Sequence, residues 1–253
     1  MASAPPVVGT RRERVREQTI DEIKSAARAE LVAHGRGGIQ LRAVARAVGL
    51  TAPALYRYFP GIDELVTAVT VDLYDELNAE LEGARDAALA VTTPPDAYQA
   101  MLATSRAFRR WAVDHPSEFG LLFATPPTGF AHPPDTPCEE ASNRFGTVFA
   151  GTFIQMWEEN PFPVEPPDAM APGLVAGLRP YWTWLTDTLA PSMPIGAVVF
   201  FLEGWVRIYG IVALEVFGHL SWAVTDGGPM FEETMRVLAR DIGRPDAYRP
   251  PLD

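Results

Sequence analysis

The side chains best suited to chemistry lie in one short segment, TAPALYRYF at positions 51–59. The guanidinium of Arg57 can donate to guanine O6 and N7 or to a phosphate, and the hydroxyls of Tyr56 and Tyr58 can hold phosphates. The small residues Pro53 and Ala54 would let the backbone come close to base edges. These residue types in this pattern indicate contact with double-stranded DNA.

A helix is needed to present these side chains together. At about 100° per residue, one side would carry apolar groups that face a core: Ala52, Leu55 and Phe59. The other side would carry small and polar groups, with Tyr56 on the flank: Pro53, Ala54, Arg57 and Tyr58. Because Thr51 is a suitable N-cap and a proline fits the first turn, we expect this helix to run from Thr51 to Pro60.

Another helix is predicted just before it. Apolar residues recur at i, i+3, i+4 and i+7 in Leu41, Val44, Ala45 and Val48. Gly49 can adopt the left-handed conformation that ends such a helix, with Leu50 as the closing apolar contact. A helix, a glycine turn and a second helix are typical of a DNA-binding helix-turn-helix, but also of an ordinary αα-hairpin.

Charge is divided unevenly along the chain. Residues 1–60 hold ten of the 21 Lys and Arg residues and five of the 32 Asp and Glu residues, net +5. The remainder is net −16 and the whole chain −11. A basic segment favours binding to phosphates, whereas an acidic one would be repelled by DNA. The first arginines form either a basic arm that follows the minor groove or a solvated first helical turn: Arg11, Arg12, Arg14 and Arg16.

The rest of the chain shows helical periodicity without sustained strand-like alternation. The expected helices cover 63–91, 96–114, 116–124, 139–159, 172–189, 194–219 and 228–242. Proline-rich connections at 125–138 and 160–173 exclude helix. With 253 residues, 47% of them hydrophobic, the chain can form a small head and a larger body with its own core. The sequence predicts an all-α fold.

Residues 195–218 form the most apolar segment, which is long enough to span a bilayer. Glu203, Arg207 and Glu215 argue against a membrane helix, because a charge near its centre costs about 2.5–3.5 kcal/mol. Glu203 and Arg207 lie at i and i+4 and could form a buried ion pair instead. We therefore predict a buried helix and no membrane contact.

Aromatic side chains are numerous in the body, and small-molecule pockets between helices are lined mainly by such groups. Core packing explains most of them equally well. The candidates for binding an apolar or aromatic molecule are Trp111, Trp157, Trp182 and Trp205, with Glu203 as a polar contact.

No catalytic or metal-binding pattern is present. The chain has no G-x-S-x-G motif and no phosphate-binding glycine loop after a strand. Its four histidines and one cysteine are not at metal-ligand spacing, so we expect no enzyme, no metal and no cofactor. Cys138 has no partner for an intrachain disulfide, which fits the reducing cytoplasm.

The segments LRAVARAVGL and TAPALYRYFPGIDEL resemble the N-terminal domain of TetR-family transcriptional regulators, over about the first quarter of the chain. The resemblance implies an all-α homodimer whose third helix reads a palindromic operator and whose larger C-terminal domain binds a small molecule that releases the DNA. It also implies that Arg42 approaches bases. The predicted DNA contacts are then Arg42, Thr51, Pro53, Ala54, Tyr56, Arg57 and Tyr58.

Two positions depart from the family pattern. Most members have a lysine that touches phosphate where this chain has Ile62, so one phosphate contact is lost. The segments WVRIYG and LEVFGHL resemble the C-terminal domain of a subset with tryptophan, histidine and glycine there, but Tyr209 replaces the histidine. In such a body, residues 195–218 would line the pocket and, with residues 228–242, form a four-helix bundle with a second subunit.

The expected organisation is a disordered or partly ordered basic arm (1–18), a three-helix helix-turn-helix domain (19–62), a helical ligand-binding and dimerisation domain (63–244) and a tail (245–253). We expect a ligand-responsive regulator, with a repressor favoured. The alternative is a helical protein that binds a small molecule or a partner but no DNA.

Overall fold

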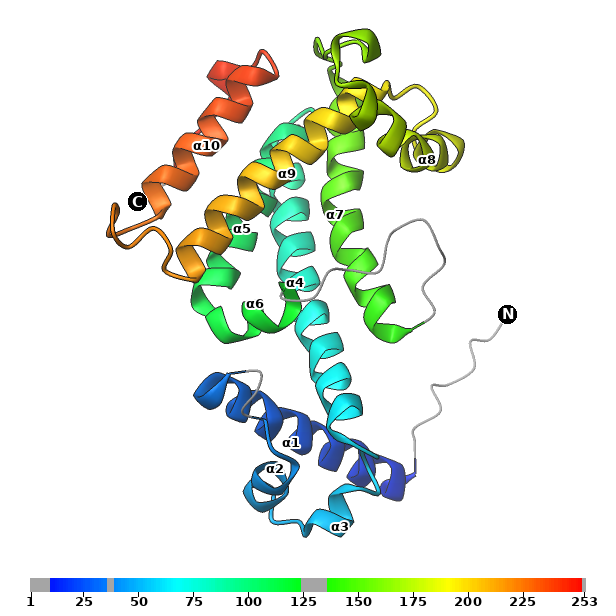
Figure 1. Cartoon of the computed structure of the whole chain (residues 1–253), viewed down its shortest axis with the longest axis vertical. Coiled ribbons are helices and arrows are strands. Elements are labelled where there is room, and N and C mark those ends of the chain that lie inside the picture. The colour runs from blue at the N-terminus through cyan, green and yellow to red at the C-terminus, as the bar shows by residue number, and fades with distance from the viewer. Residues whose placement is uncertain (1–9, 36–38, 124–135, 252–253) are drawn as a thin grey trace. The chain divides into compact units, whose positions relative to one another are not determined.

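The computed structural model describes residues 10–35, 39–123 and 136–251, and within these ranges it contains helices and no strand (Figure 1). The all-α prediction is confirmed. The α-helices are α1 (Arg11–His34), α2 (Leu41–Ala47), α3 (Ala52–Leu55), α4 (Ile62–Val91), α5 (Ala97–Asp114), α6 (Pro116–Phe123), α7 (Pro137–Glu159), α8 (Pro172–Thr188), α9 (Ile195–Val216) and α10 (Gly228–Asp241).

The chain divides into two compact units. The head comprises Met1–Leu73 and Ser117–Pro126, and the body comprises Tyr74–Pro116 and Pro127–Asp253. The expected boundary at residue 62 is too early, because Leu65 and Val69 in the first turns of α4 are buried and belong to the head.

The head also includes most of α6, which the sequence assigned to the larger domain. Arg28 of α1 donates from Nε to Oε1 of Glu118 in α6 at 3.0 Å, and Glu118 is buried. This long-range ion pair joins segments 90 residues apart, which is why local sequence patterns did not reveal it.

Residues 11–18 are helical rather than part of a partly ordered arm. Thr10 caps α1 with a reciprocal pair of hydrogen bonds: its hydroxyl accepts from the Glu13 backbone N–H, and the Glu13 carboxylate accepts from the Thr10 N–H. Such a capping box satisfies two backbone donors and starts the helix at Arg11. The expected arm before residue 10 and positions 125–135 of the proline-rich connection lie outside the described residues. The last two residues of that connection are helical, because Thr136 caps α7 and a proline fits its first turn.

In the body, α5 packs along α7, and α9 packs on α5, α8 and α10. Four rings form the centre of this core: Phe108 of α5, Phe145 and Phe149 of α7, and Trp205 of α9. Their centroids lie 5.4–6.0 Å apart in every pairing. The connection at 160–173 contains a short 3-10 turn, Pro167–Ala169.

Among the described helices, α9 alone is long and apolar enough to cross a membrane. Two of its three charged residues have partners in the body instead: Glu215 pairs with Arg109 of α5, and Arg207 pairs with Asp241 of α10, while Glu203 is exposed. These contacts are those of a helix within a helical body.

The expected C-terminal tail packs on the body. The side-chain amide of Gln99 donates to the Ala247 carbonyl at 2.7 Å, and Arg106 donates to the Arg249 carbonyl at 2.6 Å. Two side chains of α5 thus hold the described part of the segment after residue 244.

Candidate nucleic-acid interface and ligand cavity

The turn between α2 and α3 is set by a glycine. Gly49 has φ of 69°, a left-handed conformation that side chains with a Cβ rarely adopt. Its N–H donates to the Arg46 carbonyl, and the Leu50 N–H donates to the Ala45 carbonyl at 2.8 Å, which is the paired bonding of a Schellman cap. The predicted end of α2 is therefore confirmed.

The next helix begins one residue later but is shorter than predicted. The hydroxyl of Thr51 caps α3 by accepting from the Ala54 N–H at 3.4 Å. After Leu55 three-residue spacing sets in, with the Arg57 N–H donating to the Ala54 carbonyl and the Tyr58 N–H to the Leu55 carbonyl, and a last four-residue bond joins the Phe59 N–H to the Leu55 carbonyl. Pro60 lacks the N–H needed to continue a helix, so the segment ends as a tight turn.

The division of this segment into two faces is confirmed at its most buried and most exposed residues, whereas Ala52, which was predicted to face the core, is half-buried. Leu55 and Phe59 are buried, whereas Pro53, Tyr56 and Arg57 are exposed. Ala54 and Tyr58 are half-buried, and Arg42 is exposed in the first turn of α2. Contact of these residues and of Thr51 with DNA stays a prediction.

The exposed arginines of the α2–α3 segment have no carboxylate partner among the described residues: Arg42, Arg46 and Arg57. Arg16 of α1 lies over the ring of Tyr58, 5.4 Å from its centroid, which connects the start of α1 to the exposed segment. At the position of the expected phosphate-binding lysine, Ile62 begins α4 and is half-buried. The head therefore offers free guanidinium groups on a small, rigidly capped motif.

Arginines of the body are mostly paired. Arg106 binds Glu232, Arg109 binds Glu215, Arg144 binds Glu82, Arg207 binds Asp241 and Arg244 binds Asp96. Burial is the largest single effect on Asp96 and opposes its ionisation, but the hydrogen bond and charge of Arg244, together with the backbone N–H groups of Tyr98 and Gln99, outweigh burial and lower the pKa of Asp96. The predicted Glu203–Arg207 pair is wrong: both residues are exposed, and Asp241 of α10 lies closer to the guanidinium.

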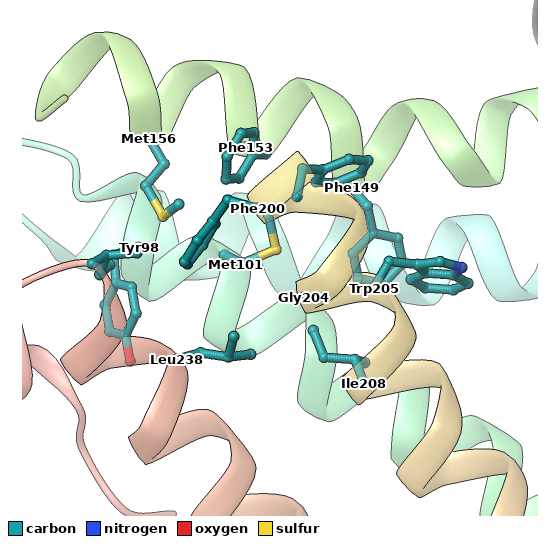
Figure 2. A pocket seen from close by; sticks show the side chains of 12 residues that line it. Tyr98, Met101, Phe149, Phe153, Met156, Phe200, Gly204, Trp205, Ile208 and Leu238 are labelled. Carbon is teal, nitrogen blue, oxygen red and sulfur yellow. The ribbon is translucent and has the colours of Figure 1, made fainter. Parts of the chain in front are cut away.

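The body contains an apolar cavity of about 60 Å³ between α5, α7, α9 and α10 (Figure 2). Its lining consists of Tyr98, Met101, Phe149, Phe153, Met156, Phe200, Phe201, Gly204, Trp205, Ile208, Leu238 and Ile242. A second, smaller cavity shares Phe153 and Phe201 with it and extends toward α8.

Of the predicted ligand contacts, Trp205 lines the larger cavity and the other four do not. Trp111 donates from its indole to Glu76 at 2.9 Å, and Trp182 donates to the Met193 carbonyl at 2.8 Å. Trp157 packs edge-on against Phe162. Glu203 is exposed. Trp111 and Trp157 thus belong to the core, Trp182 is half-buried, and the predicted polar contact is exposed.

The sequence did not single out Tyr98, Met101 or Met156 as cavity residues. Each helix does carry the signal, since lining residues recur at helical spacing: 98 and 101 in α5, 149, 153 and 156 in α7, and 200, 201, 204, 205 and 208 in α9. Periodicity gives the face of one helix but not the helix it meets.

The described residues contain no group of three or more His, Cys, Asp or Glu that could hold a metal. Cys138 lies in the first turn of α7, and burial raises the pKa of its thiol. A protonated thiol is a poor nucleophile, so this cysteine has no feature of a reactive site.

Known proteins share both the head motif and the helical body. Residues 23–69 match the family described as "Bacterial regulatory proteins, tetR family". Residues 101–238, more than half of the chain, match "Tetracyclin repressor-like, C-terminal domain". The chain belongs to the TetR family. It is therefore a transcriptional regulator with a helix-turn-helix DNA-binding domain, not an enzyme.

Individual relatives of this TetR-family chain agree. It is 32% identical to the HTH-type transcriptional regulator Rv1816 of Mycobacterium tuberculosis over 250 residues, which cover 91% of this chain and 94% of the relative. The solved structure of SCO4313 has a TM-score of 0.64 at 27% identity and covers 90% of this chain and 98% of that one. RolR, solved in complex with resorcinol, has a TM-score of 0.52 at 12% identity, covers 95% and 98%, and shows the fold alone.

Proposed function

We propose that the chain is a homodimeric repressor that binds a palindromic operator in the bacterial cytoplasm and is released by a small apolar or aromatic effector. The observation that carries the proposal is the exposed face of the α2–α3 segment, where Arg42 and Arg57 have no carboxylate partner among the described residues. Free guanidinium groups beside small residues suit a major groove.

Exposed apolar side chains on α9 and α10 support a dimer. Val206, Leu214 and Phe217 are 68%, 41% and 47% exposed, and Met230 of α10 is 47% exposed. Side chains of this kind are covered in obligate interfaces, and a second copy of the same two helices would cover them symmetrically.

Effector release is proposed to work by a shift of population. Two heads of a dimer bind successive major grooves only when they lie about 34–36 Å apart. A molecule that binds more tightly to the conformations with another spacing weakens DNA binding by its differential affinity. The cavity lined by α5, α7, α9 and α10 would hold this molecule.

The test combines subunit mass with DNA binding. In sedimentation the full chain should have twice its monomer mass. It should also bind a labelled duplex from upstream of its own gene, with one protomer on each half of the palindrome. Val206→Glu should give monomers and lose this binding. Val91→Glu, which introduces the same charge at an exposed position at the end of α4, should change neither.

A monomeric wild-type chain would overturn the dimer. A dimer without affinity for any upstream fragment would overturn operator binding.

A further inference from the structure

The lining of the larger cavity contains no charged side chain. Its twelve residues are apolar apart from Tyr98 and Trp205, and Figure 2 shows the indole nitrogen of Trp205 turned away from the other labelled side chains. An ion would lose its hydration on entering, and the cations nearest to Tyr98, Arg106 and Arg244, are already held in ion pairs with Glu232 and Asp96. The cavity therefore selects for uncharged molecules.

The hydroxyl of Tyr98 is a buried polar group with an unused hydrogen bond. The residue is 5% exposed, and no atom of the described residues bonds to its oxygen. Burial raises the pKa of Tyr98 to about 12, so the phenol keeps its proton at neutral pH and can both donate and accept. Because buried polar groups rarely lack partners, this hydroxyl is suited to a ligand.

Two neighbours fix the Tyr98 ring at the start of α5. Asp96 caps the helix by accepting from the Tyr98 backbone N–H at 2.9 Å, and Arg244 pairs with Asp96 at 2.8 Å. The same guanidinium lies over the Tyr98 ring, 5.5 Å from its centroid. In Figure 2 the hydroxyl lies at the end of the ring toward α10, on the side of Leu238, which also lines the cavity.

The rest of the lining favours an aromatic ligand. Phe149, Phe153 and Phe200 present rings, and Met101 and Met156 present thioethers that are polarisable and change conformation easily. The volume of about 60 Å³ is below the roughly 150 Å³ of a cavity that accepts benzene. The flexible methionines must therefore shift as the ligand enters.

We propose that the effector is an uncharged, mainly aromatic molecule with one polar group, which hydrogen-bonds to the hydroxyl of Tyr98. This inference rests on the proposed function, because it takes the cavity to be the effector site. Beyond the proposed function, the inference specifies that the ligand is uncharged and that Tyr98 is the residue that distinguishes it from a plain hydrocarbon.

Calorimetric titration of the full chain with three probes of one ring system tests the proposal: 2-naphthol, 2-methylnaphthalene and 2-naphthoate. The added hydrogen bond should make 2-naphthol bind about tenfold more tightly than 2-methylnaphthalene. The anion 2-naphthoate should not bind. Tyr98→Phe should abolish the tenfold preference and leave 2-methylnaphthalene binding unchanged.

Tyr74→Phe is the matched control, because Tyr74 is an equally buried tyrosine of the body that does not line the cavity. It should retain the preference. Equal or tighter binding of 2-naphthoate, a preference that survives Tyr98→Phe, or no binding of any probe would overturn the proposal. If the preference depends on Tyr98 but saturating 2-naphthol leaves the operator bound, the ligand class stands and the proposed release from DNA fails.

Discussion

The head and the body use arginine in opposite ways. In the head, Arg42 and Arg57 are exposed and have no carboxylate partner among the described residues. In the body, Arg106, Arg109 and Arg244 each bind a carboxylate of a distant segment. Most arginines of the body, like Arg28 in the head, thus join segments within their unit, whereas the exposed arginines of the α2–α3 segment stay available for the DNA contacts that we propose.

Within the head, buried side chains should stabilise the fold, whereas exposed ones should contribute little to stability. Leu55 is fully buried, whereas Tyr56 beside it is 52% exposed. Leu55→Ala should destabilise the head by about 2–5 kcal/mol, because it leaves a cavity in a small core. Hydrogen exchange of the α2 and α3 amides measures this loss of stability. Tyr56→Ala should change the free energy of opening at the same amides by about 0.5 kcal/mol or less. Equal effects of the two substitutions would contradict the assigned faces.

The free cations of the head should contribute directly to DNA affinity. Arg57→Ala should weaken operator binding by about 1–3 kcal/mol and relax the base preference at one operator position. Arg110→Ala, at an exposed arginine of α5 in the body, should leave affinity unchanged. Fluorescence anisotropy on operator variants measures both. A uniform loss over all sequences would make Arg57 a phosphate contact, and an equal loss for Arg110→Ala would contradict the division between head and body.

In the body, substitutions that line the cavity should alter ligand binding, as substitutions of the free arginines alter DNA binding in the head. A Cβ on Gly204 would lie 3.9 Å from Leu238 Cδ2, so Gly204→Ala fits and takes space from the cavity. The added helix propensity should stabilise the body by up to about 1 kcal/mol while aromatic probes bind more weakly. Gly151→Ala, on the exposed side of α7, should give the stabilisation alone. Thermal unfolding and calorimetry measure the two effects, and unchanged probe binding in Gly204→Ala would place the ligand elsewhere.

The smallest expected effect is at Ile62, where the head lacks the phosphate-binding lysine of most family members. Ile62→Lys should strengthen DNA binding and steepen the dependence of log affinity on log salt by about one phosphate contact per head. Glu64→Lys provides a charge control two residues away on the exposed side of α4. No change in affinity or salt dependence for Ile62→Lys would show that this position does not face the DNA backbone.

The two units also differ in how much of their structure could be predicted from the sequence. The α2–α3 motif is contiguous, so the cap at Gly49, the N-cap at Thr51 and the split of buried from exposed residues could all be predicted locally. Helix bounds in the body were close for the same reason, since prolines and caps punctuate the sequence.

The cavity and the contacts of the tryptophans could not be predicted from local patterns, because they depend on which helices pack against each other. The cavity draws single faces from four helices, so Tyr98 and Met101 could not be distinguished from core residues. Large tryptophans looked like ligand contacts, but Trp111 and Trp182 use their indole N–H groups inside the body. The predicted end of α3 is wrong because the turn that follows Leu55 still buries and exposes its side chains as a helix would, although it is not an α-helix.

The most direct test of the central claim, that the basic first 60 residues bind DNA through free cations, is the salt dependence of binding. Affinity of the full chain for DNA from upstream of its own gene should fall steeply and linearly on logarithmic axes between about 50 and 200 mM salt. The slope should be shallower for Arg42→Ala, which removes one of these free cations, and unchanged for Arg110→Ala. No affinity at the lowest salt, or an affinity that salt does not alter, would contradict the account.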